Sequence, residues 1–256
     1  MNLLTADIVE KFYTLLWPLA RIAAALMTAP IISVEAANAR MRLMLALGLT
    51  LLVMPLFTWP VVDPFTVEGM ALLLKEIGIG ILMGLSLQVV TGAAVVAGQA
   101  ISNSMGLSMA NLIDPNLGNV PLLSQFLLIL ATLIFFSIGG PLLLMSALVD
   151  SFTALPVGQS DFGLDAITRL LSWSSMIFLG GLLIALPVLA MLLLLNIGVG
   201  IMTRAAPSLN MMAVGVPATL MAGLVVMYVT VASISSRLEW LWLQAFMRMR
   251  DVVGIG

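Results

Sequence analysis

The stretch that decides the fold is IGIGILMGLSLQVVTGAAVVAGQAI, residues 77–101, which contains no charged residue. A helix needs about 20 apolar residues to cross the hydrocarbon core of a bilayer, so this stretch is long enough to span it. Gly80 and Gly84 are followed at four-residue steps by Gln88 and Gly92. Small side chains at this spacing let helix backbones approach closely, and a glutamine can hydrogen-bond across the contact. The stretch predicts a membrane helix packed against a neighbour, either within the chain or in another subunit.

The rest of the chain has the same character. Of its 256 residues, 62% are apolar and only 9% are charged, against about 25% charged in a typical soluble domain. Further apolar runs cover residues 12–34, 43–62, 122–149, 173–203 and 211–236. None of them alternates with a period of two, as a lipid-exposed β-barrel requires. We therefore predict an all-α membrane protein with about six apolar helices.

Two of these runs are interrupted by helix-breaking residues. Residues 122–149 contain Gly139-Gly140-Pro141, and residues 173–203 contain Pro187 near their middle. Proline removes a backbone hydrogen bond and kinks a helix, and irregular backbone at membrane depth must be covered by protein or water. We expect kinked helices or helical hairpins here rather than plain spans.

The residues that the chain lacks exclude several classes of function. Without histidine or cysteine, it cannot hold a catalytic Ser-His-Asp or Cys-His group, an HExxH zinc site or a disulfide. A net charge of −2 gives no electrostatic case for nucleic acid. Asp150, Asp161 and Asp165 match no ligand spacing, so a solvated loop is the better interpretation. We expect no cofactor, no metal and no enzymatic activity.

Arg21 lies ten residues inside the first apolar run. An arginine at the centre of a membrane helix costs about 2.5–3.5 kcal/mol on insertion scales. It either snorkels to a shallow helix end or binds a carboxylate, carbonyl groups, water or another protein. Arg40 and Arg42 already mark the far end of this region, which favours a buried partner for Arg21.

Residues 102–121 form the most unusual segment, because they contain no Lys or Arg and are too short to span a bilayer. Flexible or apolar side chains lie among small residues and are followed by the turn signal Asp114-Pro115. Methionine packs adaptably and fills irregular gaps, so a deformable plug is one interpretation. A re-entrant or interfacial loop without a gating role is the other, and the residues alone favour it.

Spaced motifs along the chain resemble those of the FliR family. Members of this family are components of the flagellar type III secretion export gate, and their counterpart in injectisomes is called SctT. The resemblance covers about residues 12–237 and rests on the following residues: Arg21, Pro30, Arg40-Met-Arg42, Leu45 and Pro55; Glu76-Ile-x-x-Gly80-x-x-x-Gly84, Gly98 and Met105-Gly106-Leu107; Asp114-Pro115; Ser151-Phe152-x-x-x-Pro156-x-Gly158; Arg204-x-x-Pro207-x-x-Asn210 and Gly215-x-Pro217. One departure is Pro141, where the family usually has a histidine.

The resemblance implies a single export-gate domain over residues 1–256, with a FliP-like part over about 1–150 and a FliQ-like part over about 151–256. One copy would join several FliP and FliQ subunits in a helical gate in the bacterial inner membrane, at the flagellar basal body. FlhB would wrap this gate and FlhA would lie beneath it. Exported flagellar proteins would pass through the pore, and membrane lipid would contact its outside.

The resemblance also implies roles for individual residues. The plug between the third and fourth runs would include Met105, Gly106, Leu107, Met109, Leu112, Asp114 and Pro115. Helix packing and assembly would involve Gly80, Gly84, Gln88, Gly98, Arg21, Arg204, Pro207, Asn210, Gly215 and Pro217. Taken alone, residues 204–210 favour a plain turn between two helices.

The alternative function is a stand-alone secondary transporter, which broken helices and a buried arginine would fit. Two observations disfavour it: the apolar runs contain no Asp or Glu for coupling, and the chain has no inverted repeat. An intramembrane enzyme is weaker still, because no pair of Asp residues lies within a run.

Overall fold

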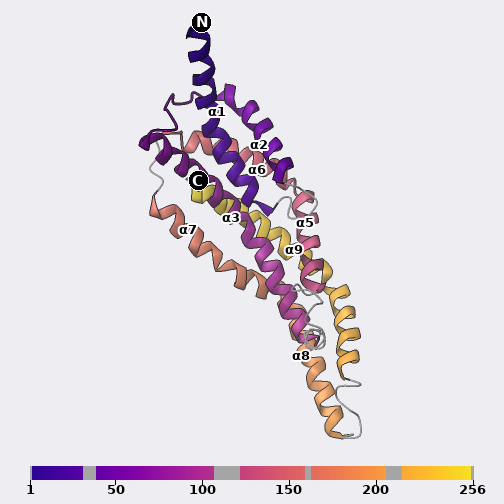
Figure 1. The fold of residues 1–256 in the computed structure, drawn as a ribbon. Helices are drawn as coiled ribbons and strands as arrows, with labels where there is room; N and C mark the ends of the chain where they lie inside the picture. The colour runs from indigo at the N-terminus through magenta and orange to yellow at the C-terminus, as the bar shows by residue number, and fades with distance from the viewer. Residues whose placement is uncertain (1, 31–38, 107–121, 159–162, 206–214, 255–256) are drawn as a thin grey trace. The chain divides into compact units, whose positions relative to one another are not determined.

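The computed structural model describes residues 2–30, 39–106, 122–158, 163–205 and 215–254. Over these residues the chain is helical and contains no β-strand (Figure 1). Together with the apolar helices described below, this confirms the predicted all-α membrane fold. The helices are α1 (Asn2–Thr28), α2 (Ala39–Val53), the 3₁₀ helix η2 (Met54–Leu56), α3 (Val67–Ser104), α5 (Leu122–Ser137), α6 (Gly140–Ala154), α7 (Leu164–Ser174), α8 (Met176–Ala205) and α9 (Val216–Val253).

By length and composition, the described residues hold four candidate membrane spans: Ala39–Leu56, Val67–Ser104, Leu164–Met202 and Pro217–Val253. A fifth is the pair of α5 and α6, which passes the same test together and is interrupted by a break at residues 138–139. The predicted break at Gly139-Gly140-Pro141 is therefore confirmed. Gly139 has a φ of +73°, which only glycine adopts readily, and Pro141 lies in the first turn of α6, where its missing N–H costs nothing. Proline at this position thus has a structural reason.

The helices do not begin and end where the predicted apolar runs do. Residues 67–76, which precede the run 77–101, form the first turns of α3. Asp150 and Asp165, for which a solvated loop was predicted, belong to α6 and α7, and α9 continues beyond the run 211–236 to Val253. The physical reason is that hydropathy marks only where a helix is apolar, whereas a helix can also contain polar and charged residues, several of which have high helix propensity. As a result Glu76 lies inside α3, so the prediction that the spans hold no acidic residue was also wrong.

The chain forms two compact units, each built from separate segments. Unit 1 contains Met1–Val89, Gly139–Ser174 and Gln244–Gly256, and unit 2 contains Val90–Ile138 and Ser175–Leu243. Helices α3 and α9 each contribute residues to both units. The division of the chain near residue 150 into FliP-like and FliQ-like parts stays a prediction.

In unit 1, α2 lies beside α1 (Figure 1), and α7 is held against the first part of α3. The indole N–H of Trp173 donates to the backbone oxygen of Ser86 at 2.9 Å. Leu82 on α3, Ala166 on α7 and Val252 at the end of α9 form a small apolar cluster beside it. Burial of these apolar groups fixes α7 on the unit.

Unit 2 contains the second part of α3, together with α5, α8 and most of α9. Helices α8 and α9 run antiparallel, because Gly180 lies against Leu241 and Leu183 lies against Arg237. We call these two helices the α8–α9 hairpin. Trp242 is 1% exposed and donates its indole N–H to the backbone oxygen of Ala131 on α5, at 2.9 Å. A buried tryptophan thus satisfies its polar atom while its ring fills the core.

Candidate assembly site

Arg21 and Glu76 form a fully buried ion pair at the centre of unit 1. The Nε of Arg21, on α1, lies 2.7 Å from the Oε2 of Glu76, on α3, and both side chains are 0% exposed. The expectation that Arg21 has a buried partner is therefore confirmed, and that partner is a carboxylate. Removing one member of such a pair would leave an uncompensated charge inside the protein.

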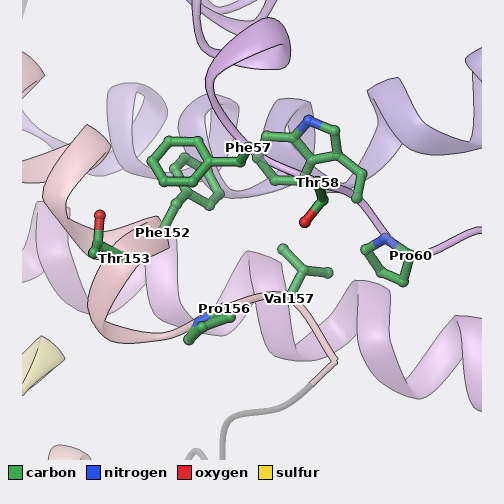
Figure 2. Close-up of a pocket in the computed structure, with 8 residues that line it drawn as sticks. Phe57, Thr58, Pro60, Phe152, Thr153, Pro156 and Val157 are labelled. Atoms are coloured by element: carbon green, nitrogen blue, oxygen red, sulfur yellow. The ribbon is translucent and has the colours of Figure 1, made fainter.

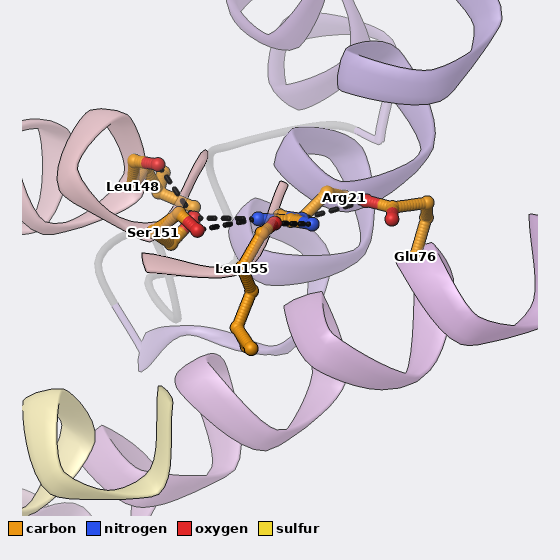
Figure 3. Close-up of polar contacts among 5 residues, drawn as sticks. All are labelled: Arg21, Glu76, Leu148, Ser151 and Leu155. Carbon is orange, nitrogen blue, oxygen red and sulfur yellow. Dashed lines mark hydrogen bonds and ion pairs between the residues drawn. The ribbon is translucent and has the colours of Figure 1, made fainter. Parts of the chain in front are cut away.

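The same guanidinium also binds the end of α6 (Figure 3). Its Nη1 donates to the backbone oxygen and the hydroxyl of Ser151 at 2.9 and 3.1 Å, and its Nη2 donates to the backbone oxygen of Leu155 at 2.9 Å. The Ser151 hydroxyl in turn donates to the backbone oxygen of Leu148 at 2.6 Å. The last carbonyl groups of a helix lack partners within the helix, and a cation there also balances the helix dipole.

An aromatic ring completes the surroundings of Arg21. The guanidinium carbon lies 4.3 Å from the ring centroid of Phe152, which is the geometry of a cation–π contact. Phe152 also packs against Trp59, with ring centroids 5.2 Å apart, and against Phe57 at 6.0 Å. One arginine thus joins α1, α3, α6 and the aromatic residues that follow α2.

Gly80 explains how Arg21 reaches Glu76. A Cβ atom at Gly80 would overlap the backbone oxygen of Arg21 and lie 2.8 Å from the Cβ of Ala24. One turn further along α3, a Cβ at Gly84 would overlap the side chain of Thr28. These two glycines let the backbones of α1 and α3 come close enough for the ion pair to form.

The other predicted packing residues of α3 have different surroundings. Gly98 lies in unit 2, where a Cβ would overlap the backbone of Ser124 on α5, whereas Gln88 is exposed. Gly80, Gly84 and Gly98 thus have contacts within the chain. Contacts of the small-residue stripes with other subunits stay a prediction.

Two of the predicted plug residues belong to the described chain. Met105 directly follows α3, is 1% exposed and lies against Gly223 on α9, where a Cβ would come 2.8 Å from its Cγ and Sδ atoms. Thr219 donates its hydroxyl to the backbone oxygen of Met105 at 3.4 Å. Gly106 follows with a φ of +79°. Leu107, Met109, Leu112, Asp114 and Pro115 lie outside the described residues.

Of the last motif, residues 204–217, the structure describes only the two ends. Arg204 is exposed near the end of α8, Gly215 is buried before α9, and Pro217 is exposed in the first turn of α9. Pro207 and Asn210 lie outside the described residues.

A pocket of about 530 Å³ beside Phe152 was not predicted from the sequence (Figure 2). Its lining is uncharged and consists of Phe57, Thr58, Trp59, Pro60, Phe152, Thr153, Pro156 and Val157. The indole N–H of Trp17 donates to the backbone oxygen of Pro60 at 3.1 Å, which fixes one wall. The aromatic residues at positions 57, 59 and 152 were the available signal, but they are far apart in the sequence.

The described residues contain no group of three or more His, Cys, Asp or Glu side chains that could hold a metal ion. The polar centre of unit 1 instead consists of one cation, one carboxylate, one hydroxyl and backbone oxygens. This composition suits a structural connection between helices, since the guanidinium, one carboxylate oxygen and the hydroxyl are each bound by another part of the same chain.

The fold and this site define an all-α membrane protein whose helices are joined by a buried polar cluster. The family described as "Bacterial export proteins, family 1" matches residues 12–245. Escherichia coli (strain K12) flagellar biosynthetic protein FliR is 36% identical over 238 residues, which is 93% of this chain and 91% of that protein. The protein of the same name from Pectobacterium carotovorum is 35% identical over 248 residues, 96% of this chain and 95% of its own length.

A more distant relative is the Bacillus subtilis (strain 168) flagellar biosynthetic protein FliR, 31% identical over 169 residues, or 64% of this chain and 65% of that protein. The chain therefore belongs to the FliR family of bacterial export proteins, which confirms the resemblance stated above. It is a membrane protein of the flagellar export apparatus. Arg21, Glu76 and Ser151-Phe152 belong to three of the motifs that carried the resemblance, and they meet in one cluster.

Proposed function

We propose that this chain is a core subunit of the flagellar protein-export gate. One copy assembles with several FliP and FliQ subunits in the bacterial inner membrane, with FlhB around the gate and FlhA beneath it. Flagellar proteins cross through the pore that these subunits enclose, and the chain itself catalyses no reaction. The observation that carries the proposal is the similarity to FliR over nearly the whole length of both proteins.

The apolar surface of the α8–α9 hairpin supports this assembly. In the most apolar 18-residue stretch of the α7–α8 span 33% of the residues are buried, and in that of α9 only 22%. Side chains such as Leu194, Ile201 and Tyr228 are 66%, 65% and 81% exposed. Apolar patches of this kind mark sites of protein or membrane contact, and the proposal assigns part of this surface to FliP and FliQ.

The proposed plug is the segment that follows α3. In the closed gate, Leu107 and Met109 would fill the pore, with Met105 at the start of the segment, because methionine and leucine side chains adapt to irregular space without fixed geometry. The described part of the segment is consistent with a plug whose first residues are held by the rest of the chain. Met105 is buried, and Thr219 binds its backbone oxygen.

The experiment that tests the plug is an ion conductance measurement on membranes that carry the assembled gate. Deletion of residues 106–116 should leave assembly with FliP and FliQ intact and raise the conductance above that of the wild-type gate. A matched control removes the side chains instead of the chain, through the triple change Leu107→Ala, Met109→Ala and Leu112→Ala, and should give a smaller leak. Unchanged conductance in an assembled deletion variant would refute the plug.

A further inference from the structure

Pro187 interrupts the hydrogen-bond ladder in the middle of α8. Proline has no backbone N–H, so the carbonyl oxygen four residues earlier loses its partner within the helix. In α8 that oxygen belongs to Leu183. In an apolar environment such an unpaired carbonyl is unfavourable, and broken membrane helices persist where a neighbouring group replaces the lost bond.

Arg237 on α9 provides this group. Its Nη1 donates to the backbone oxygen of Leu183 at 2.7 Å, across the antiparallel contact of the two helices. A hydrogen bond from a charged donor is stronger than the amide bond that it replaces. This bond thus reaches the carbonyl oxygen that Pro187 leaves without its partner within α8.

The surroundings of α8 change on either side of this point. Before it, Gly180 and Gly181 pack closely on α3, where a Cβ at Gly181 would lie 2.9 Å from Val96. After it, Val188 and Leu192 are buried, but no described side chain from residue 193 to 204 is buried. Pro187 therefore separates a half of α8 that is held by close packing from a half that has few contacts of its own.

We propose that Arg237 is a positioning residue that replaces the amide missing at Pro187 and thereby fixes the direction of α8 beyond the break. With the bond in place, residues 188–205 keep one orientation relative to α9. Without it, α8 bends at Pro187, where the ladder is already interrupted. The inference concerns the chain itself and goes beyond the proposed function in the export gate.

The test measures this orientation directly. Because the chain contains no cysteine, spin labels can be attached in the full-length protein at Leu194→Cys and Leu243→Cys, which replace exposed leucines on α8 and α9. Pulsed electron paramagnetic resonance then gives the distribution of distances between the labels. A second pair, Phe178→Cys with Leu243→Cys, reports on the half of α8 before Pro187 and is the control.

Each pair is measured in four backgrounds: wild type, Arg237→Gln, Pro187→Ala, and both changes together. We expect Arg237→Gln to broaden the Leu194–Leu243 distribution and to raise the population of other orientations about fivefold or more, as the loss of one hydrogen bond from a charged donor implies. Pro187→Ala restores an N–H for Leu183, so Arg237→Gln should have little effect in that background. The Phe178–Leu243 distances should stay the same throughout.

Further variants separate this role from a general structural one. Arg237→Lys keeps a cationic donor and should retain most of the wild-type distance distribution. If the whole guanidinium acted by packing instead, lysine would not restore this distribution. An equal effect of Arg237→Gln with proline or with alanine at position 187 would overturn the proposal. Flagellar protein export in cells should follow the same pattern, but that readout also depends on the proposed function, while the distances do not.

Discussion

Helix α3 and the α8–α9 hairpin are both long and apolar, but the chain covers them very differently. In the most apolar stretch of α3, 67% of the residues are buried, against 33% for the α7–α8 span and 22% for α9. Close glycine contacts and the Arg21–Glu76 pair hold α3 within the chain, whereas much of the hairpin surface is left open. The difference indicates which part of the protein is complete by itself and which part depends on lipid or partner subunits.

The largest expected effect breaks the covered region at its polar centre. Arg21→Ala should lower the free energy of unfolding by about 3–5 kcal/mol, because Glu76 then stays buried without a counter-charge. The measurement is a denaturant titration of the full-length chain in detergent, followed by tryptophan fluorescence. Arg40→Ala, at an exposed arginine, is the control and should change stability little. Equal losses in both variants would contradict the account.

The next prediction compares two leucines on α8 that differ only in exposure. Leu192 is 0% exposed and Leu194 is 66% exposed. Leu192→Ala should cost about 2–5 kcal/mol in the isolated chain, as is usual for a buried leucine, while Leu194→Ala should stay within about 0.5 kcal/mol. In cells that also produce FliP and FliQ, Leu194→Ala should instead lower the yield of purified complex. A stable complex with Leu194→Ala would mean that lipid, and not a subunit, covers this position.

A smaller effect is expected where α3 meets α5. Gly98→Ala places a Cβ against the backbone of Ser124, so the two helices must separate, at a cost of about 1–3 kcal/mol. Gly48→Ala in α2 is the matched control, because nothing lies within 4 Å of its Cβ position. That change should raise stability by up to about 1 kcal/mol through helix propensity. Thermal unfolding followed by circular dichroism measures the stability of both variants. A Gly98→Ala variant as stable as the wild type would mean that the contact between α3 and α5 is loose.

The smallest effect is expected at the exposed ion pairs of unit 1. Arg250 lies 3.3 Å from Asp150, with side chains 45% and 47% exposed. Arg250→Ala should lower the free energy of unfolding by less than about 1 kcal/mol, and the difference should shrink as salt is added. Denaturant titrations at low and high ionic strength measure this difference in the free energy of unfolding. A loss as large as that of Arg21→Ala would show that burial does not decide what an ion pair contributes.

The covered region could be predicted from the sequence in its main features. A lone arginine inside an apolar run needs a partner, and the glycine spacing of α3 indicates close packing. The identity of the partner could not be read, because Glu76 stands just outside the apolar run and the run was taken as the whole helix. Local hydropathy marks where a helix is apolar, but charged residues such as glutamate also have good helix propensity, so α3 extends beyond the apolar run.

The open region was harder to predict. A kink or hairpin was predicted at Pro187, but α8 continues through it as one helix. The contact of Arg237 depends on the antiparallel register of α8 and α9, which places residue 237 beside residue 183. No local sequence pattern predicts the register between these two helices. The aromatic pocket at Phe57, Trp59 and Phe152 was missed for the same reason, since its walls come from segments about 90 residues apart in the sequence.

The central claim is that the open apolar surface belongs to an export gate. Native mass spectrometry tests it most directly, on the tagged full-length chain produced alone and together with FliP and FliQ from the same genome. We expect one discrete complex that holds a single copy of this chain and several copies of each partner. A stable monomer or homodimer that binds neither partner would contradict the proposal and would make a stand-alone transporter the function to test.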